Sequence, residues 1–152
     1  MSMENLYQQI ILDHYKHPRN FGEVLGCTVS AEHDNPSCGD QIRIHLLVQD
    51  GKVEKVQFSG KGCAISQASA SMMTEALKGK TVAEAQQMVD EFRQMMRGEK
   101  EYVALDEAGE LEALKGVLQF PVRVKCAVLA WDTMDACIHM QENGEDTPPE
   151  KP

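Results

Sequence analysis

The apolar positions at the start of the chain follow a helical period. Between Glu4 and His17 they recur at intervals of three and four residues, which predicts an amphipathic helix. Pro18 disfavours helical backbone at the residue before it. The helix is therefore expected to end at about His17.

Three stretches that follow alternate between apolar and polar side chains, as half-buried strands do. They cover residues 27–33, 41–49 and 53–59, and in the third the alternation slips by one residue after Val53. An Asp-Gly pair at 50–51 is a hairpin-turn signal. The pattern predicts three strands in an antiparallel meander, with one apolar face that other elements must cover.

The second half of the chain has a helical pattern. Residues 66–77 are small and then apolar, which predicts a helix that packs closely against its neighbours. Thr81 and Glu84 have the spacing of a capping box, so a further helix should begin there and run to about Met96. The remaining segments are expected to be a polar loop over 98–110, a short helix over 111–117, an extended segment over 120–122 and a long helix over 123–141.

The predicted strands are consecutive and most of the helices follow them, which is typical of an α+β fold. We expect one three-stranded antiparallel sheet with helices packed on one of its faces. The chain of 152 residues suits a single domain, which we place at residues 1–144. The proline-rich residues 145–152 are expected to form a disordered tail.

Charge and cysteine content narrow the class of protein. The chain carries 24 acidic and 15 basic side chains, which argues against nucleic acid as a partner because that needs a basic surface. No apolar run suits a membrane span or an N-terminal signal peptide. We therefore expect a cytoplasmic protein whose five cysteines stay reduced and serve as ligands, nucleophiles or core residues.

Three of the cysteines lie in settings that suit a metal site better than a core. Cys38 and Asp40 share a Pro-Ser-Cys-Gly-Asp turn. Cys63 follows a Gly-Lys-Gly loop, and Cys126 lies in the first turn of the last predicted helix, where backbone N–H groups favour the thiolate. Three thiolates and one carboxylate are a plausible ligand set for Zn²⁺ or for an iron–sulfur cluster, with the carboxylate as the most exchangeable ligand.

Other features leave alternatives open. Cysteines are common core residues, which is the expected role of Cys27 and Cys137 and an equally good interpretation of Cys126 taken alone. Arg123 is one helical turn before Cys126, where it either pairs with Asp40 or a partner protein or is a plain surface residue. None of the five histidines has a ligand-like neighbour in the sequence, so no histidine is expected in the site.

These motifs resemble the three signature segments of the U-type iron–sulfur assembly proteins, the family of IscU, SufU and the NifU N-terminal domain. The matching segments are Asn-Pro-Ser-Cys-Gly-Asp at 35–40, Gly-Lys-Gly-Cys-Ala-Ile at 60–65 and Arg-Val-Lys-Cys-Ala-Val-Leu-Ala-Trp at 123–131. Lys125 stands where the IscU branch has a histidine, and the stretch between Cys63 and Cys126 is longer than in IscU. Both features resemble the SufU branch.

The resemblance implies a SufE/NifU-like fold and a set of functional residues. The implied zinc ligands are Cys38, Asp40, Cys63 and Cys126. Cys38 would leave the metal to accept persulfide sulfur, while Asp40 keeps the metal bound. The implied partners are a PLP-dependent group II cysteine desulfurase of the SufS type and downstream iron–sulfur assembly proteins.

Two other functions use the same residues. The first alternative is a scaffold on which a [2Fe–2S] cluster is assembled and then transferred to apo-proteins, with iron in place of zinc. The second is a purely structural zinc domain that serves protein contacts.

Overall fold

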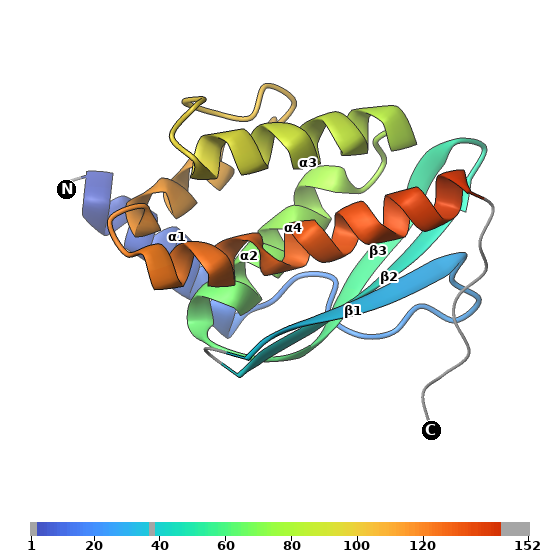
Figure 1. Cartoon of the computed structure of the whole chain (residues 1–152), viewed down its shortest axis with the longest axis horizontal. Coiled ribbons are helices and arrows are strands. Elements are labelled where there is room, and N and C mark those ends of the chain that lie inside the picture. Colours follow the sequence, from blue (N-terminus) through green and yellow to red (C-terminus); the bar gives the residue numbers. More distant parts are fainter. Residues whose placement is uncertain (1–2, 37–38, 144–152) are drawn as a thin grey trace.

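The computed structural model describes residues 3–36 and 39–143, and the tail predicted at 145–152 lies outside them. The elements are α1 (Met3–Lys16), β1 (Val29–Asn35), β2 (Asp40–Gln49), β3 (Lys52–Lys61), α2 (Ala64–Leu77), α3 (Val82–Met96), the 3₁₀ helix η1 (Leu111–Val117) and α4 (Pro121–Glu142) (Figure 1). In this described part of the chain, every helix is too short or too polar to cross a membrane.

The three strands form one antiparallel sheet in the order β1-β2-β3. Leu46 in the middle of β2 pairs with Val29 on one side and Val56 on the other, and all three are buried in the core. Figure 1 shows the helices gathered on the same side of the sheet. The predicted α+β fold, with a three-stranded antiparallel sheet and helices on one face, is confirmed.

The connection between β2 and β3 is the predicted hairpin. Asp50 and Gly51 have φ angles of 54° and 74°, the left-handed conformations that an Asp-Gly pair adopts in a tight hairpin. A register shift in this pair of strands leaves Glu54 as an extra residue in β3. The shift is the structural cause of the slip in the alternation after Val53, because a bulge moves the following side chains by one position.

Small side chains on α2 allow α4 to approach closely. The Ser69 hydroxyl donates to the Ala127 carbonyl at 2.6 Å and accepts from the Trp131 indole N–H at 3.1 Å. The Trp131 ring stacks on Phe92 of α3, with centroids 4.1 Å apart and an angle of 7° between the planes. These contacts confirm the predicted close packing and fix the position of α4, which carries Cys126.

Several predicted boundaries differ by one or two residues from those of the structure, and two of the differences change the interpretation. The first strand spans Val29–Asn35 rather than 27–33, so it ends three residues before Cys38 in the sequence. In the segment 120–122, predicted to be extended, only Phe120 is non-helical, with φ −123° and ψ 89°, because α4 begins at Pro121. Proline is well accommodated at the first position of a helix, where its missing N–H has no helical partner to lose.

The polar stretch between α3 and η1 is irregular, as predicted, but it is held firmly against the helices. The Ala104 N–H donates to Glu91 Oε1 at 2.8 Å, and His14 Nε2 lies 2.9 Å from Glu110 Oε1. Val103 is buried in the core. The stretch is therefore part of the same packed unit as the sheet and the helices.

Candidate metal centre

Three potential ligands from distant segments meet at one end of the molecule. One ligand atom each from Asp40, Cys63 and Cys126 lies within 4.8 Å of the other two. Asp40 is the first residue of β2, Cys63 is the N-cap of α2, and Cys126 is the sixth residue of α4. In Figure 1 the starts of these three elements lie at the same end of the fold. The structure thus brings together three of the four predicted ligands.

The carboxylate of Asp40 is buried and held by the start of α2. The Cys63 N–H donates to Asp40 Oδ1 at 2.8 Å, while Oδ2 lies 3.8 Å from Cys63 Sγ. A buried carboxylate needs such partners, because removing it from water is costly. One oxygen is therefore fixed by the backbone and the other is directed toward the sulfur.

Gly62 makes this approach possible. A Cβ at this position would lie 2.6 Å from the Ser66 hydroxyl oxygen and still closer to Asp40 Oδ1. Any side chain would therefore push the Asp40 carboxylate or α2 out of place. The glycine before Cys63 is required by the close packing of the site.

Cys63 is half-buried and caps the N-terminus of α2. The N-terminal end of a helix favours negative charge because its first N–H groups and its dipole point outward. The Ser66 hydroxyl donates to the Cys63 carbonyl at 3.1 Å, which fixes the backbone at the cap. The position therefore suits a thiolate.

Cys126 is 2% exposed, and its sulfur contacts both its own helix, α4, and the end of β1. Its Sγ is 3.7 Å from the Val122 carbonyl, one turn earlier, and accepts from Asn35 Nδ2 at 3.9 Å. Because α4 begins at Pro121, Cys126 lies in the second turn. The prediction that it lies in the first turn of the helix is wrong, and the N–H donor found at its sulfur comes from Asn35.

The donors present suit zinc. Zn²⁺ accepts both thiolates and carboxylates, and a tetrahedral site with bonds of about 2.0–2.3 Å spaces its ligand atoms by roughly 3.3–3.8 Å. The 3.8 Å between Cys63 Sγ and Asp40 Oδ2 already meets that spacing. Movements of about 1 Å would bring all three donor atoms, now within 4.8 Å, onto one ion.

Cys38, the fourth predicted ligand, lies outside the described residues, so its role stays a prediction. It belongs to the connection between β1 and β2, in which the Gly39 N–H donates to the Asn35 carbonyl at 2.9 Å. One residue separates Cys38 from Asp40 in the sequence.

Arg123 is exposed at the start of α4. Its guanidinium lies over the Phe120 ring, 5.4 Å from the ring centroid. The pairing of Arg123 with Asp40 that the sequence allowed does not form. Of the alternatives considered, contact with a partner protein and a plain surface position both fit this geometry.

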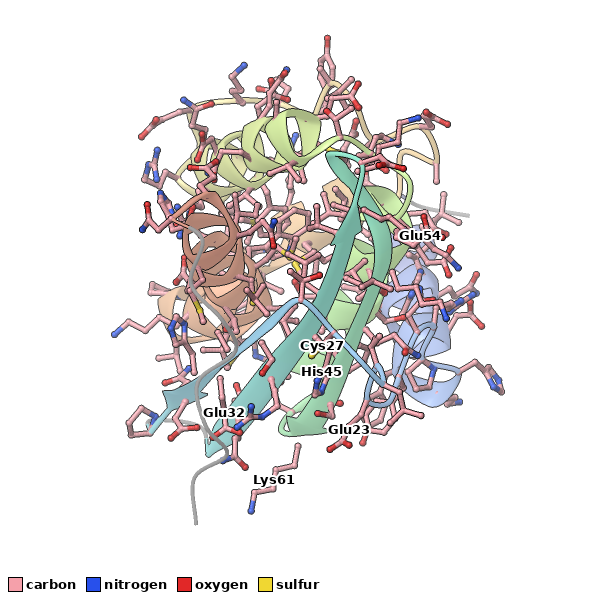
Figure 2. The ribbon with its side chains drawn as sticks, turned by 90° about the vertical axis from the view of Figure 1, so that its right-hand side faces the viewer. Glu23, Cys27, Glu32, His45, Glu54 and Lys61 are labelled. Carbon is pink, nitrogen blue, oxygen red and sulfur yellow. The ribbon has the colours of Figure 1, made fainter. Side chains whose placement is uncertain are left out.

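The two other described cysteines lie apart from the group. Cys137 is fully buried, its thiol donates to the Ile44 carbonyl at 3.8 Å, and burial raises the pKa of this thiol to about 12. Cys27 is half-buried and precedes β1. Figure 2 shows Cys27 in the middle of the view, whereas Lys61, two residues before Cys63, lies at the lower edge. The core role predicted for Cys137 is confirmed.

Two residues of this region were missed by the sequence analysis. Asn35 contacts the Cys126 sulfur, and Ser66 fixes the backbone of Cys63. Asn35 belongs to the same sequence motif as Cys38 and Asp40, and this proximity is a sequence signal for a place near the site. Its contact with Cys126 spans 91 residues of sequence, so no local pattern could reveal it.

A cavity of about 350 Å³ lies elsewhere, between α1, α2 and the residues before η1. Its lining includes none of Asp40, Cys63 and Cys126. The candidate metal centre is therefore separate from this cavity.

Comparison with known proteins agrees with the geometry. A model of the NifU-like N-terminal domain matches residues 6–127. The zinc-dependent sulfurtransferase SufU of Bacillus subtilis is 46% identical over 143 residues, which cover 94% of this chain and 96% of that protein. The iron–sulfur cluster assembly scaffold protein IscU of Streptococcus pyogenes is 39% identical over 143 residues, covering 94% and 89%.

A solved structure supports the same assignment. It is a candidate iron–sulfur cluster assembly scaffold protein for the SUF system from Fervidobacterium islandicum, 33% identical to this chain, with a TM-score of 0.81. The match covers 90% of this chain and 99% of that one. With the family model matching most of the sequence and the three donors in place, the chain belongs to the family of NifU-like N-terminal domains.

Proposed function

We propose that this protein is a zinc-dependent sulfurtransferase that accepts persulfide sulfur from a cysteine desulfurase for iron–sulfur cluster assembly. The observation that carries the proposal is the convergence of Asp40, Cys63 and Cys126 within 4.8 Å. The name and 46% identity of the Bacillus subtilis relative support the choice of a sulfurtransferase.

The proposed zinc ligands are these three residues together with Cys38. Bound zinc would keep the thiolates deprotonated without adding redox chemistry of its own. Asp40 and Cys63 are linked through the Cys63 N–H, and Cys126 is anchored by Asn35. A carboxylate is by softness the most exchangeable of the four ligands, but Asp40 is held by the Cys63 N–H. We therefore assign Asp40, Cys63 and Cys126 to the permanent part of the site and the reaction to Cys38.

The reaction of Cys38 is a thiol exchange. Its thiolate attacks the outer sulfur of the persulfide on the desulfurase cysteine. A new S–S bond forms at Cys38, and the original S–S bond breaks with its electron pair moving to the desulfurase sulfur. The desulfurase cysteine leaves as a thiolate and Cys38 carries the persulfide, so no external oxidant or reductant is needed.

The proposed partner is a PLP-dependent group II cysteine desulfurase of the SufS type. A protein-bound persulfide must be brought to the site by a docked protein, and the surface next to the site suits such a contact. Phe120 and Val122, at the start of the helix that carries Cys126, are 50% and 60% exposed. Exposed apolar side chains beside a site are typical of protein interfaces.

A desulfurase assay tests the proposal. The zinc-loaded protein should stimulate the release of sulfur from cysteine by the desulfurase, and Cys38→Ala should abolish that stimulation while the protein remains folded. Cys27→Ala is the matched control, because Cys27 lies outside the donor group. Full stimulation by Cys38→Ala would refute the proposal.

A scaffold function is the second candidate, because the Streptococcus pyogenes relative is named as a scaffold. The same donors would then hold a [2Fe–2S] cluster. Metal analysis of the protein as isolated separates the two functions. One tightly held zinc per chain supports sulfur transfer, whereas an iron–sulfur chromophore that passes to an apo-protein supports the scaffold.

A further inference from the structure

We propose that Asn35 is a positioning residue that holds the Cys126 sulfur in the metal site by donating a hydrogen bond from its side-chain amide. The inference rests on the zinc site proposed above. It adds a residue that acts through a ligand rather than on the metal itself.

The place of Asn35 in the fold makes it a link between the parts of the site. It is the last residue of β1, it is 8% exposed, and its Nδ2 lies 3.9 Å from Cys126 Sγ. Its backbone pairs with Asp40 across the sheet, and its carbonyl accepts from the Gly39 N–H at 2.9 Å. Asn35 therefore connects Cys126 with Asp40 and with the short connection that contains Cys38.

The direction of the hydrogen bond distinguishes Asn35 from the carboxylate and carbonyl neighbours of the two sulfurs. The Cys63 thiol faces the Asp40 carboxylate and the Ser66 hydroxyl, and the Cys126 thiol faces the Val122 carbonyl. The Asp40 and Val122 oxygens only accept, so their bonds require the thiol proton, whereas the Ser66 hydroxyl can turn and donate to a thiolate. Metal binding removes that proton.

The bond from Asn35 behaves in the opposite way. Its N–H donates to the sulfur, so the contact persists when the thiol becomes a thiolate and strengthens because the acceptor is then charged. The thiolate loses the bond to the Val122 carbonyl, and the bond from Asn35 continues to orient the Cys126 side chain. Partners of this kind orient a ligand and increase the affinity of a site for its metal.

The consequence for sulfur transfer follows from the same bond. An N–H donor draws electron density from the sulfur, which makes Cys126 a poorer nucleophile toward a persulfide. It also retains Cys126 on the metal while Cys38 reacts. Asn35 thus helps to make Cys126 a permanent ligand rather than a sulfur acceptor.

Two substitutions separate this role from a purely structural one. Asparagine residues at turns commonly use the side-chain oxygen as an acceptor. Asn35→Asp keeps the shape and that oxygen, but it replaces the N–H donor with a negative charge next to a thiolate. Asn35→Ala removes donor and acceptor together. A turn-forming role predicts that Ala is the more harmful change, whereas the proposed role predicts that Asp is.

The experiment uses Co²⁺ as a spectroscopic substitute for zinc in the full chain. Affinity is measured by competition with a chelator, and the sulfur-to-cobalt charge-transfer band is recorded for each variant. We expect affinity to fall by about 10-fold in Asn35→Ala and by about 100-fold in Asn35→Asp. The band should move to lower energy in Asn35→Ala, because the sulfur lone pair loses the stabilising N–H.

Asn143→Asp and Asn143→Ala make the same chemical changes at the exposed end of α4 and should alter neither quantity. Two results would overturn the role of Asn35 but not the zinc site. The first is wild-type metal affinity and an unshifted charge-transfer band in both Asn35 variants. The second is a smaller loss of metal affinity in Asn35→Asp than in Asn35→Ala. Failure of the wild-type protein to bind Co²⁺ or Zn²⁺ would instead overturn the proposed site, and the role of Asn35 with it.

Discussion

Cys126 and Cys137 lie on the same helix and on the same face of it, because eleven residues make about three turns. Both are buried, at 2% and 0% exposure. Cys126 lies within reach of Asp40 and Cys63 and accepts an N–H from Asn35. Cys137 faces the sheet, where its thiol donates to a backbone carbonyl of β2.

The difference shows that burial alone does not decide what a cysteine does. Both side chains are removed from water, and Cys137 too has a sulfur (Cys27) and a backbone N–H (Ala31) near it. Within the described residues, only Cys126 of the two lies within ligand distance of a carboxylate, that of Asp40. At Cys137, burial raises the pKa to about 12, which disfavours the thiolate that a ligand or a nucleophile needs. Polar neighbours from other segments make Cys126 a candidate ligand.

The largest expected effect is on zinc affinity, when Cys126 and Cys137 are each replaced by alanine. Cys126→Ala should lower zinc affinity by more than about 100-fold, because loss of a ligand exceeds the effect of losing its supporting partner. Cys137→Ala should bind one zinc as the wild type does. Metal content after dialysis against a weak chelator measures both, and similar zinc retention in the two variants would remove the distinction.

Metal removal should affect stability next most strongly. A ligand present at 1,000 times its dissociation constant stabilises the folded state by about 4 kcal/mol. For a chain of this size, that corresponds to a fall in Tm of about 8 °C or more on chelation. Thermal unfolding with and without chelator checks this, with Cys126→Ala as the control whose Tm should not respond. If chelation leaves the wild-type Tm unchanged, the result would contradict a zinc ion that joins four ligands from separate segments.

Gly62→Ala should disturb the site from the side of Asp40. The added methyl has no room beside the Asp40 carboxylate and the Ser66 hydroxyl, so zinc affinity should fall by about 10–100-fold. Gly116→Ala is the matched control, because a Cβ there meets no atom within 4 Å. Equal affinity in both variants would show that the site tolerates a displaced Asp40.

The raised pKa of Cys137 predicts a smaller effect at high pH. The thiol begins to ionise at its ordinary pKa of 9.0 in the unfolded chain but only near 12 in the folded one. Between these values the unfolded state binds fewer protons, so stability falls by about 1.4 kcal/mol per pH unit. Urea unfolding at pH 8 and pH 10 should show a steeper loss in wild type than in Cys137→Ala. An equal loss of stability in wild type and in Cys137→Ala between pH 8 and pH 10 would contradict the raised pKa of Cys137.

The smallest effect is expected far from both cysteines. Thr81 accepts from the Glu84 N–H and Glu84 accepts from the Thr81 N–H, which forms the capping box predicted for α3. Thr81→Ala should cost about 1 kcal/mol of stability and leave zinc affinity unchanged. Denaturant unfolding and zinc competition together test whether stability and the site are separable. A loss of zinc affinity in Thr81→Ala would show that the metal site depends on the stability of α3.

Local patterns were sufficient for much of the fold. The alternation of apolar residues predicted three strands, and the Asp-Gly pair and Thr81 with Glu84 predicted a hairpin and a helix start, because each depends on neighbours in sequence. Glycine-rich surroundings also identified Cys63 as a candidate ligand. The start of α4 was misplaced, since a proline can either precede a helix or begin it.

The supporting contacts of the site could not be predicted in this way. Asn35 contacts Cys126 only when β1 and α4 pack together. Gly62, between β3 and α2, lies next to the Asp40 carboxylate at the start of β2. Such contacts depend on the position of whole helices and strands. The sequence therefore suggested candidate metal ligands, and the structure was needed to show which contacts hold three of them in place.

In the proposed function, Cys38 accepts sulfur while Asp40, Cys63 and Cys126 hold the metal. The most direct measurement is mass spectrometry of the zinc-loaded protein after reaction with a group II cysteine desulfurase and cysteine, with each cysteine-containing peptide analysed separately. We expect one added sulfur atom on Cys38 and none on Cys63, Cys126 or Cys137, with zinc still bound. Added sulfur on Cys63 or Cys126, or none on any cysteine, would contradict it.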